Sequence, residues 1–137
     1  LREFLGSVVN AVDKTIPLTW EGDDEVIVNT ALGALERVFN NLLVNALQHG
    51  GTTEVRVDVQ ENIDIHVIDN GPGIPAQDRD KVFQPFYRIE GSRSRHTGGS
   101  GLGLAIVDQL CQAHGWQIEL SESDAGGTDA RLTVPTV

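Results

Sequence analysis

One long amphipathic segment, residues 31–48, constrains the fold of this chain more than any other feature. Its apolar residues recur every three or four positions, which predicts a helix with a single buried face. They occupy positions 35, 38, 39, 42, 43, 46 and 47. Thr30 can cap this helix, and Gly50 with Gly51 can end it. Such a helix needs a second layer that covers its apolar stripe.

The rest of the chain supplies further helices and a set of strands. Helical spacing predicts two more helices, at 1–12 and 101–115. Short runs rich in β-forming residues predict strands at 15–22, 24–30, 53–60, 61–70, 116–123 and 128–135. Turns at 60–62 and 124–127 join the last four into two hairpins. This order predicts an α+β fold, a two-layer α/β sandwich whose mixed, mostly antiparallel sheet of about five strands is covered on one face by three helices.

Length and charge limit the classes of function. The 137 residues suffice for a single domain over residues 1–137 and are too few for two comfortable ones. The formal net charge of −10 disfavours a general binder of nucleic acid or anionic membranes. No apolar run approaches the roughly 18–20 residues of a membrane span. The single cysteine, Cys111, excludes a disulfide framework and a thiolate metal cluster.

Two glycine-rich stretches carry possible binding chemistry. In DNGPGIP, residues 69–75, Asp69 ends a strand, and the glycines permit close approach of the backbone. A plain turn with a solvated Asp69 would also satisfy this pattern. HTGGSGLGLAIV, residues 96–107, leads directly into a helix, which exposes N–H groups and the positive end of the helix dipole to an anion. It matches neither a dinucleotide fold nor a P-loop.

The positive charges and the helix amides are also unevenly placed. Five of the ten Lys and Arg residues lie within residues 79–95, which fits an anion site or a solvated loop. Asn41 and Asn45 lie one turn apart in the long helix, although asparagine is a mediocre residue for a helix interior. Taken one at a time, these features leave the function open.

Four segments in order give a much more specific signal. They are NNLLVNALQHG, DNGPGIP, FQPFYR and GGSGLGLAIV. Their order resembles the N box, first glycine box, F box and second glycine box of the ATP-binding catalytic domain of bacterial sensor histidine kinases. That domain belongs to the GHKL superfamily, with gyrase, MutL and a heat-shock chaperone. The resemblance covers essentially the whole chain and is closest to membrane-bound sensor kinases such as EnvZ.

This resemblance implies ATP and Mg²⁺ as cofactors and assigns roles at the phosphates. Asn45 would be the metal ligand, because an amide oxygen suits a hard cation without adding charge beside the phosphates. Asn41, Asn45, Arg93 and Arg95 would be the catalytic residues, with the two arginines in a mobile ATP lid over residues 88–98. The backbone N–H groups at the phosphates would come from Gly99, Ser100, Gly101, Leu102 and Gly103.

The resemblance also assigns the base pocket. Asp69 would accept a hydrogen bond from the adenine amino group, which selects adenine over guanine. The wall beside the base would be Gly71, Gly73 and Ile74, and Leu104 would close it. Gln48, His49 and Tyr87 are further candidates for contact with the nucleotide. Phe83, Phe86 and Tyr87 match the F box, and we expect them mainly to anchor the lid segment in an apolar groove.

Two adjacent positions depart from the family pattern. Gln48 stands where the family often carries Lys or Arg, and His49 stands where an aromatic residue is common. Gln48 can bond a phosphate but brings no charge, so we expect the lid arginines to supply more of the transition-state stabilisation. If Arg93→Ala and Arg95→Ala each left phosphotransfer unchanged, this expectation would be wrong.

The resemblance implies a kinase whose acceptor lies elsewhere. None of the four histidines, His49, His66, His96 and His114, has the sequence context of the family's phosphoacceptor. We therefore expect partners in the dimerisation domain of the same kinase and in a response regulator, with no nucleic acid. The fragment would be a monomeric cytoplasmic piece of a dimeric parent anchored in the bacterial inner membrane. The alternatives are a degenerate nucleotide-binding module and an ATPase of the chaperone or MutL type.

Overall fold

The computed structural model describes residues 1–23, 25–26, 31–48, 52–87, 103–124 and 126–136. These ranges contain three α-helices, which are α1 (Arg2–Val12), α2 (Leu32–Gln48) and α3 (Gly103–His114). They contain five strands, which are β1 (Leu18–Glu21), β2 (Thr53–Val59), β3 (Asn62–Asp69), β4 (Gln117–Glu122) and β5 (Thr128–Pro135). Two short 3₁₀ helices, η1 (Ala76–Asp78) and η2 (Lys81–Phe83), follow β3.

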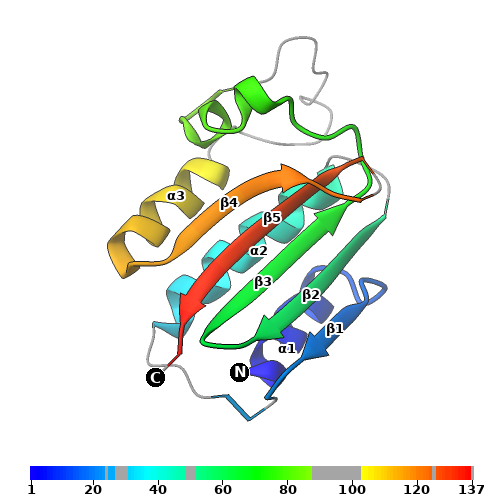
Figure 1. The fold of residues 1–137 in the computed structure, drawn as a ribbon, viewed down its shortest axis with the longest axis vertical. Coiled ribbons are helices and arrows are strands. Elements are labelled where there is room, and N and C mark those ends of the chain that lie inside the picture. The colour runs from blue at the N-terminus through cyan, green and yellow to red at the C-terminus, as the bar shows by residue number, and fades with distance from the viewer. Residues whose placement is uncertain (24, 27–30, 49–51, 88–102, 125, 137) are drawn as a thin grey trace.

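The five strands form one sheet in the order β1-β2-β3-β5-β4. β1 runs parallel to β2, and the other neighbours are antiparallel. All three α-helices lie on one face of this sheet, with α2 between α1 and α3 (Figure 1). The predicted α+β sandwich, with its mixed and mostly antiparallel sheet, is therefore confirmed. The strand predicted at 24–30 falls mainly outside the described residues.

Helix α2 lies at the centre of the core. Its apolar stripe packs on β2 and β3 and is flanked by the neighbouring helices. The buried residues of the stripe are Leu35, Val38, Phe39, Leu42, Leu43 and Ala46. Leu47 was expected to belong to this stripe, but it is 37% exposed because it lies at the edge of the stripe in the last helical turn. None of the described helices has the length and apolar composition needed to cross a membrane.

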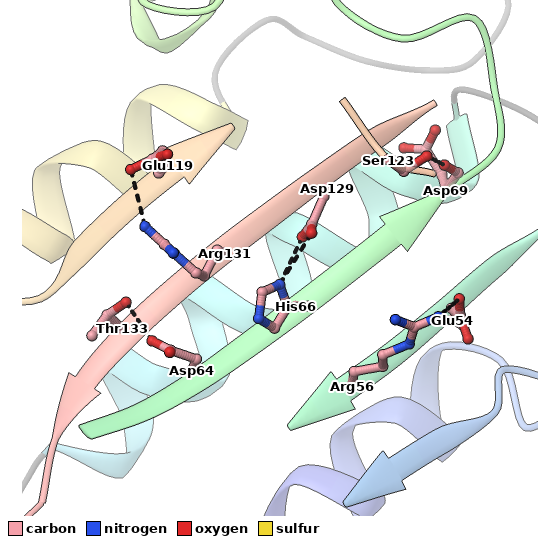
Figure 2. A network of polar contacts seen from close by, with 10 residues as sticks. All are labelled: Glu54, Arg56, Asp64, His66, Asp69, Glu119, Ser123, Asp129, Arg131 and Thr133. Carbon is pink, nitrogen blue, oxygen red and sulfur yellow. Dashed lines mark hydrogen bonds and ion pairs between the residues drawn. The ribbon is translucent and has the colours of Figure 1, made fainter. Parts of the chain in front are cut away.

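The face of the sheet opposite the helices carries a polar network (Figure 2). Thr133 donates a hydrogen bond to Asp64 at 2.7 Å, and His66 Nδ1 lies 3.0 Å from Asp129. Arg131 pairs with Glu119 at 3.0 Å. We call these six residues the open-face network. Because each of the three pairs joins neighbouring strands, the network links β3, β5 and β4.

Candidate nucleotide-binding site

Asp69 lies at the carboxyl end of β3 and points to the helix-covered side of the sheet. It is only 3% exposed. Its Oδ1 accepts hydrogen bonds from the backbone N–H groups of Gly71, at 3.0 Å, and Thr128, at 3.3 Å. Hydrogen bonds from backbone N–H groups to a carboxylate are stronger than neutral ones and fix its orientation. Asp69 is therefore a buried, oriented acceptor, and the alternative of a solvated Asp in a plain turn is wrong.

The backbone around Asp69 is crossed closely by the turn between β4 and β5. A Cβ added at Gly127 would lie 2.1 Å from the Asp69 carbonyl oxygen, so only glycine fits there. The Ser123 hydroxyl donates to the same carbonyl at 3.0 Å (Figure 2). Gly73 has a φ of +77°, and a Cβ there would lie 2.9 Å from the carbonyl oxygen of Gly126. The close approach expected from the first glycine box thus exists, and the second partner is the turn before β5.

Two threonines flank Asp69, and the sequence reasoning did not identify them. Thr53 is the register partner of Asp69 on β2, and Thr128 is its neighbour on β5. Both are buried, and neither hydroxyl has a hydrogen-bond partner within the described residues. We call Thr53, Asp69 and Thr128 the buried row. An unpaired buried hydroxyl costs roughly 1–3 kcal/mol, so two of them beside a carboxylate indicate a place prepared for a polar ligand.

A signal for these threonines was present in the sequence. In β2 and β5 the positions that face the helices are otherwise apolar, namely Val55 and Val57 in β2 and Ala130, Leu132 and Val134 in β5. Thr53 and Thr128 are the first residues of their strands and are the polar exceptions in this alternation.

Four of the residues predicted to lie near the phosphates are described, namely Asn41, Asn45, Gln48 and Gly103. The Asn41 amide nitrogen donates to the Arg37 carbonyl at 2.9 Å. Its Oδ1 would lie 3.3 Å from a Cβ added at Gly103, so the Asn41 side chain lies close to the first residue of α3. Asn45 and Gln48 are half-buried on the following turns of α2. The last turn of α2 and the first turn of α3 lie at the same end of the molecule as the carboxyl end of β3 (Figure 1).

The segment between β3 and the F box is held by specific contacts. Ile74 is buried, and its carbonyl accepts a hydrogen bond from Arg79 Nε at 3.2 Å. The Tyr87 hydroxyl donates to the Asp78 carboxylate. Phe83 packs against the hydrophobic core, as does Leu104 from α3. Phe86 was expected to share this anchoring role, but that is wrong, because it is 68% exposed and has a φ of +65°.

Several predicted site residues lie outside the described residues. They are His49, Arg93, Arg95, Gly99, Ser100, Gly101 and Leu102, together with the rest of the lid segment 88–98. Their roles remain predictions. The same holds for the assignment of Asn45 to a metal.

The described residues hold no group of three His, Cys, Asp or Glu side chains that could bind a metal ion. A single amide oxygen from Asn45 is nevertheless compatible with Mg²⁺, which is commonly held by one or two protein oxygens together with phosphates and waters. Burial raises the pKa of the Cys111 thiol to about 12, so this cysteine is no nucleophile. A hollow of about 320 Å³ lies beside α3 and β4, and its lining includes none of the predicted site residues.

Comparison with known proteins bears on the family and the fold of this chain. Residues 31–137 match the family described as histidine kinase-, DNA gyrase B- and HSP90-like ATPases. The chain belongs to this family. The ATPase domain is 38% identical over 119 residues to the sensor histidine kinase WalK of Bacillus subtilis (strain 168), which covers 82% of this chain and 20% of that protein. It is 40% identical over 104 residues to the sensor histidine kinase CpxA of Escherichia coli (strain K12), which covers 74% of this chain and 23% of that protein.

Solved structures agree with the fold. The mycobacterial sensor histidine kinase MprB superposes with a TM-score of 0.78 at 27% identity, over 98% of this chain and 93% of that one. The catalytic domain of the histidine kinase ThkA gives a TM-score of 0.80 at 19% identity, over 98% and 92% of the two chains, which supports the fold alone. The ATPase domain spans only 20–23% of the length of the two curated relatives. The predicted family is confirmed, and the chain is an ATPase domain of the histidine-kinase type.

Proposed function

We propose that this domain binds ATP with Mg²⁺ and donates the γ-phosphoryl group to a histidine on the dimerisation domain of a sensor kinase. A response regulator aspartate would receive the phosphoryl group next. The observation that carries this proposal is the oriented, buried Asp69 carboxylate, which lies at the end of the fold where α2 ends and α3 begins. Membership of the ATPase family and the similarity to sensor histidine kinases support it.

At the base, Asp69 accepts a hydrogen bond from the adenine amino group. Guanine presents a carbonyl oxygen at the same place, which would leave a buried carboxylate facing another acceptor. Gly71, Gly73 and Ile74 form the wall beside the ring, and Leu104 closes the apolar side. The half-buried position of Leu104 at the start of α3 is compatible with this role.

At the phosphates, Asn45 would hold Mg²⁺ through its amide oxygen, and the metal would neutralise part of the phosphate charge. The N–H groups of Gly99, Ser100, Gly101, Leu102 and Gly103 bind the phosphate oxygens. Arg93 and Arg95 stabilise the charge that develops during transfer. Gln48, His49 and Tyr87 add polar contacts around the nucleotide. A Gln at position 48 gives no charge, so the two arginines carry more of the stabilisation than in relatives with a cation there.

The reaction breaks the bond between the γ-phosphorus and the β–γ bridging oxygen and forms a phosphorus–nitrogen bond to the acceptor imidazole. ADP leaves with the bridging oxygen, and the imidazole loses one proton. Asn41 favours transfer over hydrolysis, because a neutral amide is no general base for water near neutral pH. The Asn41 side chain lies close to Gly103, the first residue of α3.

The acceptor histidine belongs to another part of the parent protein. We propose that the parent is a dimeric sensor kinase anchored in the bacterial inner membrane, that this domain is cytoplasmic and monomeric when isolated, and that it does not bind nucleic acid. The length of the curated relatives beyond the matched region is consistent with further domains.

The test is reconstitution with the dimerisation domain from the same gene. Labelled ATP should transfer its γ-phosphoryl group to that domain and leave the isolated ATPase domain almost unlabelled. A stoichiometric phosphohistidine on the isolated domain would contradict the proposal. Binding of ATP without transfer would favour a degenerate nucleotide-binding module. The observation that favours this alternative is Gln48, which stands where the family often carries a cation. Fast hydrolysis without transfer would favour an ATPase of the chaperone or MutL type.

A further inference from the structure

Thr53 occupies an unusual environment for a hydroxyl group. It is the first residue of β2, lies directly opposite Asp69, and is 7% exposed. Its Oγ1 is shielded from solvent and has no hydrogen-bond partner among the described residues. Buried polar groups in native proteins nearly always have a partner. The structure therefore contains a donor whose partner is not a protein group of the described chain.

The neighbours of Thr53 indicate where that partner would lie. Directly opposed residues of an antiparallel pair point to the same face, with their Cβ atoms about 4.5–5.5 Å apart. The Thr53 hydroxyl is thus within reach of a group bound by the Asp69 carboxylate. Thr128 lies on the other side of Asp69, with a second unpaired hydroxyl among the described residues. The buried row presents one acceptor between two hydroxyl groups that can donate.

Adenine carries the complementary pattern along one edge. Its amino group donates, and the ring nitrogens N1 and N7 on either side of the amino group accept. We propose that Thr53 is a purine-reading residue whose hydroxyl donates a hydrogen bond, directly or through one water, to a ring nitrogen of the adenine that Asp69 binds. This inference rests on the proposed function and assigns it a further specificity-determining residue.

A purely structural role for Thr53 makes a different prediction. Valine has the same branched shape as threonine and equal aptitude for a strand, and it would leave no polar group unpaired. If Thr53 served only to pack, Thr53→Val would keep the ATP affinity of the wild type. If the Thr53 hydroxyl reads the purine, Thr53→Val should keep the stability of the domain and lower its ATP affinity.

The experiment measures ATP affinity by calorimetry and unfolding by urea for the wild type, Thr53→Val, Thr53→Ser and Thr133→Val. We expect Thr53→Val to unfold at the same or a higher urea concentration without nucleotide, and to bind ATP roughly three- to tenfold more weakly. Thr53→Ser should bind like the wild type, because it keeps the hydroxyl. Thr133→Val, on the open face of β5, should leave the affinity unchanged. Equal affinity of Thr53→Val and wild type would overturn the inference.

Nucleotide analogues identify the contacted atom. ATP analogues lacking N1 or N7, the 1-deaza and 7-deaza forms, should each be titrated into the wild type and Thr53→Val. The penalty of the substitution should vanish for one of the two analogues, because the bond it removes is already absent. A penalty that persists with both would overturn the inference. Should Thr53→Val fail to fold, the inference still requires the wild type to lose affinity for one deaza analogue, and equal binding of both would overturn it.

The outcome also separates this inference from the proposed function. A wild type that binds ATP while Thr53→Val binds it equally well removes only the role of Thr53. A wild type that does not bind ATP contradicts both.

Discussion

Strands β3 and β5 carry two polar clusters, one on each face of the sheet, and the clusters differ in how their groups are paired. In the open-face network the hydroxyl, imidazole, guanidinium and carboxylate groups meet one another at 2.7–3.0 Å (Figure 2). In the buried row two hydroxyls beside Asp69 have no partner within the described part of the chain. Mutual pairing near solvent contributes to the stability of the sheet, whereas unpaired buried groups lower stability and are ready to bind a ligand.

The largest expected effect comes from the backbone crossing that supports the buried row. Gly127→Ala would place a Cβ 2.1 Å from the Asp69 carbonyl oxygen, so the strands must move apart. We expect a loss of about 3 kcal/mol or more in the free energy of unfolding, measured by urea denaturation. Gly33→Ala is the matched control, because its Cβ would meet nothing within 4 Å in α2. That substitution should stabilise the domain by up to about 1 kcal/mol. Equal stability of Gly127→Ala and wild type would show that the crossing is dispensable.

The two aspartates of β3 test whether the faces differ in function. Asp69→Asn removes the carboxylate that we assign to the adenine amino group, and ATP should bind ten- to hundredfold more weakly. Asp64→Asn changes a carboxylate on the open face of the same strand and should keep the affinity within about twofold of the wild type. Calorimetric titration with ATP measures both. A similar loss of ATP affinity in the two variants would contradict the assignment of nucleotide binding to the helix-covered face alone.

The two threonines of β5 should respond with opposite signs. Thr133→Val removes a 2.7 Å hydrogen bond to Asp64 and should lower the free energy of unfolding by about 1 kcal/mol without changing ATP affinity. Thr128→Val removes a hydroxyl that has no described partner. It should keep or raise stability and weaken ATP binding several-fold. Urea denaturation measures the stability of both variants, and calorimetry measures their ATP affinity. A loss of stability in Thr128→Val would argue against the expected difference between the two threonines.

The smallest expected effect is the pH dependence of the open-face network. The hydrogen bond to Asp129 raises the pKa of His66 above its ordinary value of 6.5, and the charges of Asp129 and Asp64 add to this, while burial and Arg131 oppose it. A raised pKa in the folded state means that the stabilisation is present below pH 6.5 and is lost as the pH rises through the folded-state pKa.

Unfolding in urea at about pH 6 and about pH 8.5 tests this term. Between these two pH values, the wild type should lose more stability than Asp129→Asn. The difference should be less than about 1 kcal/mol, because the His66–Asp129 pair is partly exposed. ATP affinity at constant pH should not change in Asp129→Asn. A pH dependence equal to that of the wild type would show that the pair contributes nothing.

Much of the fold followed from periodicity alone. The apolar stripe of α2 and the alternation in β2 and β3 are local patterns, and they are enough to predict which face of each element is buried and hence the two layers. Leu47 and Phe86 were misjudged, because exposure at the edge of a stripe or in a loop depends on neighbours that are distant in sequence. The parallel pairing of β1 with β2 is likewise a property of the assembled sheet.

The candidate site was predictable where a motif is local. Asp69 and its glycines form one continuous segment, and the resemblance identified them. Thr53 and Thr128 lie 16 residues before and 59 residues after Asp69 along the chain, and only strand register brings them together. Their polarity at helix-facing positions was visible, but a threonine at the start of a strand is ordinary on β propensity alone.

The central claim is that a purine binds at the buried row on the helix-covered face of the sheet. Its most direct test is NMR of the domain with methyl-labelled Ile and Thr and saturating Mg²⁺ with a non-hydrolysable ATP analogue. We predict intermolecular NOEs from adenine H2 or H8 to Ile74 and Thr128, and none to Ile68 and Thr133, which lie on the open-face side of the same two-stranded region. Saturable binding with NOEs to Ile68 or Thr133, and none to Ile74 or Thr128, would contradict the account.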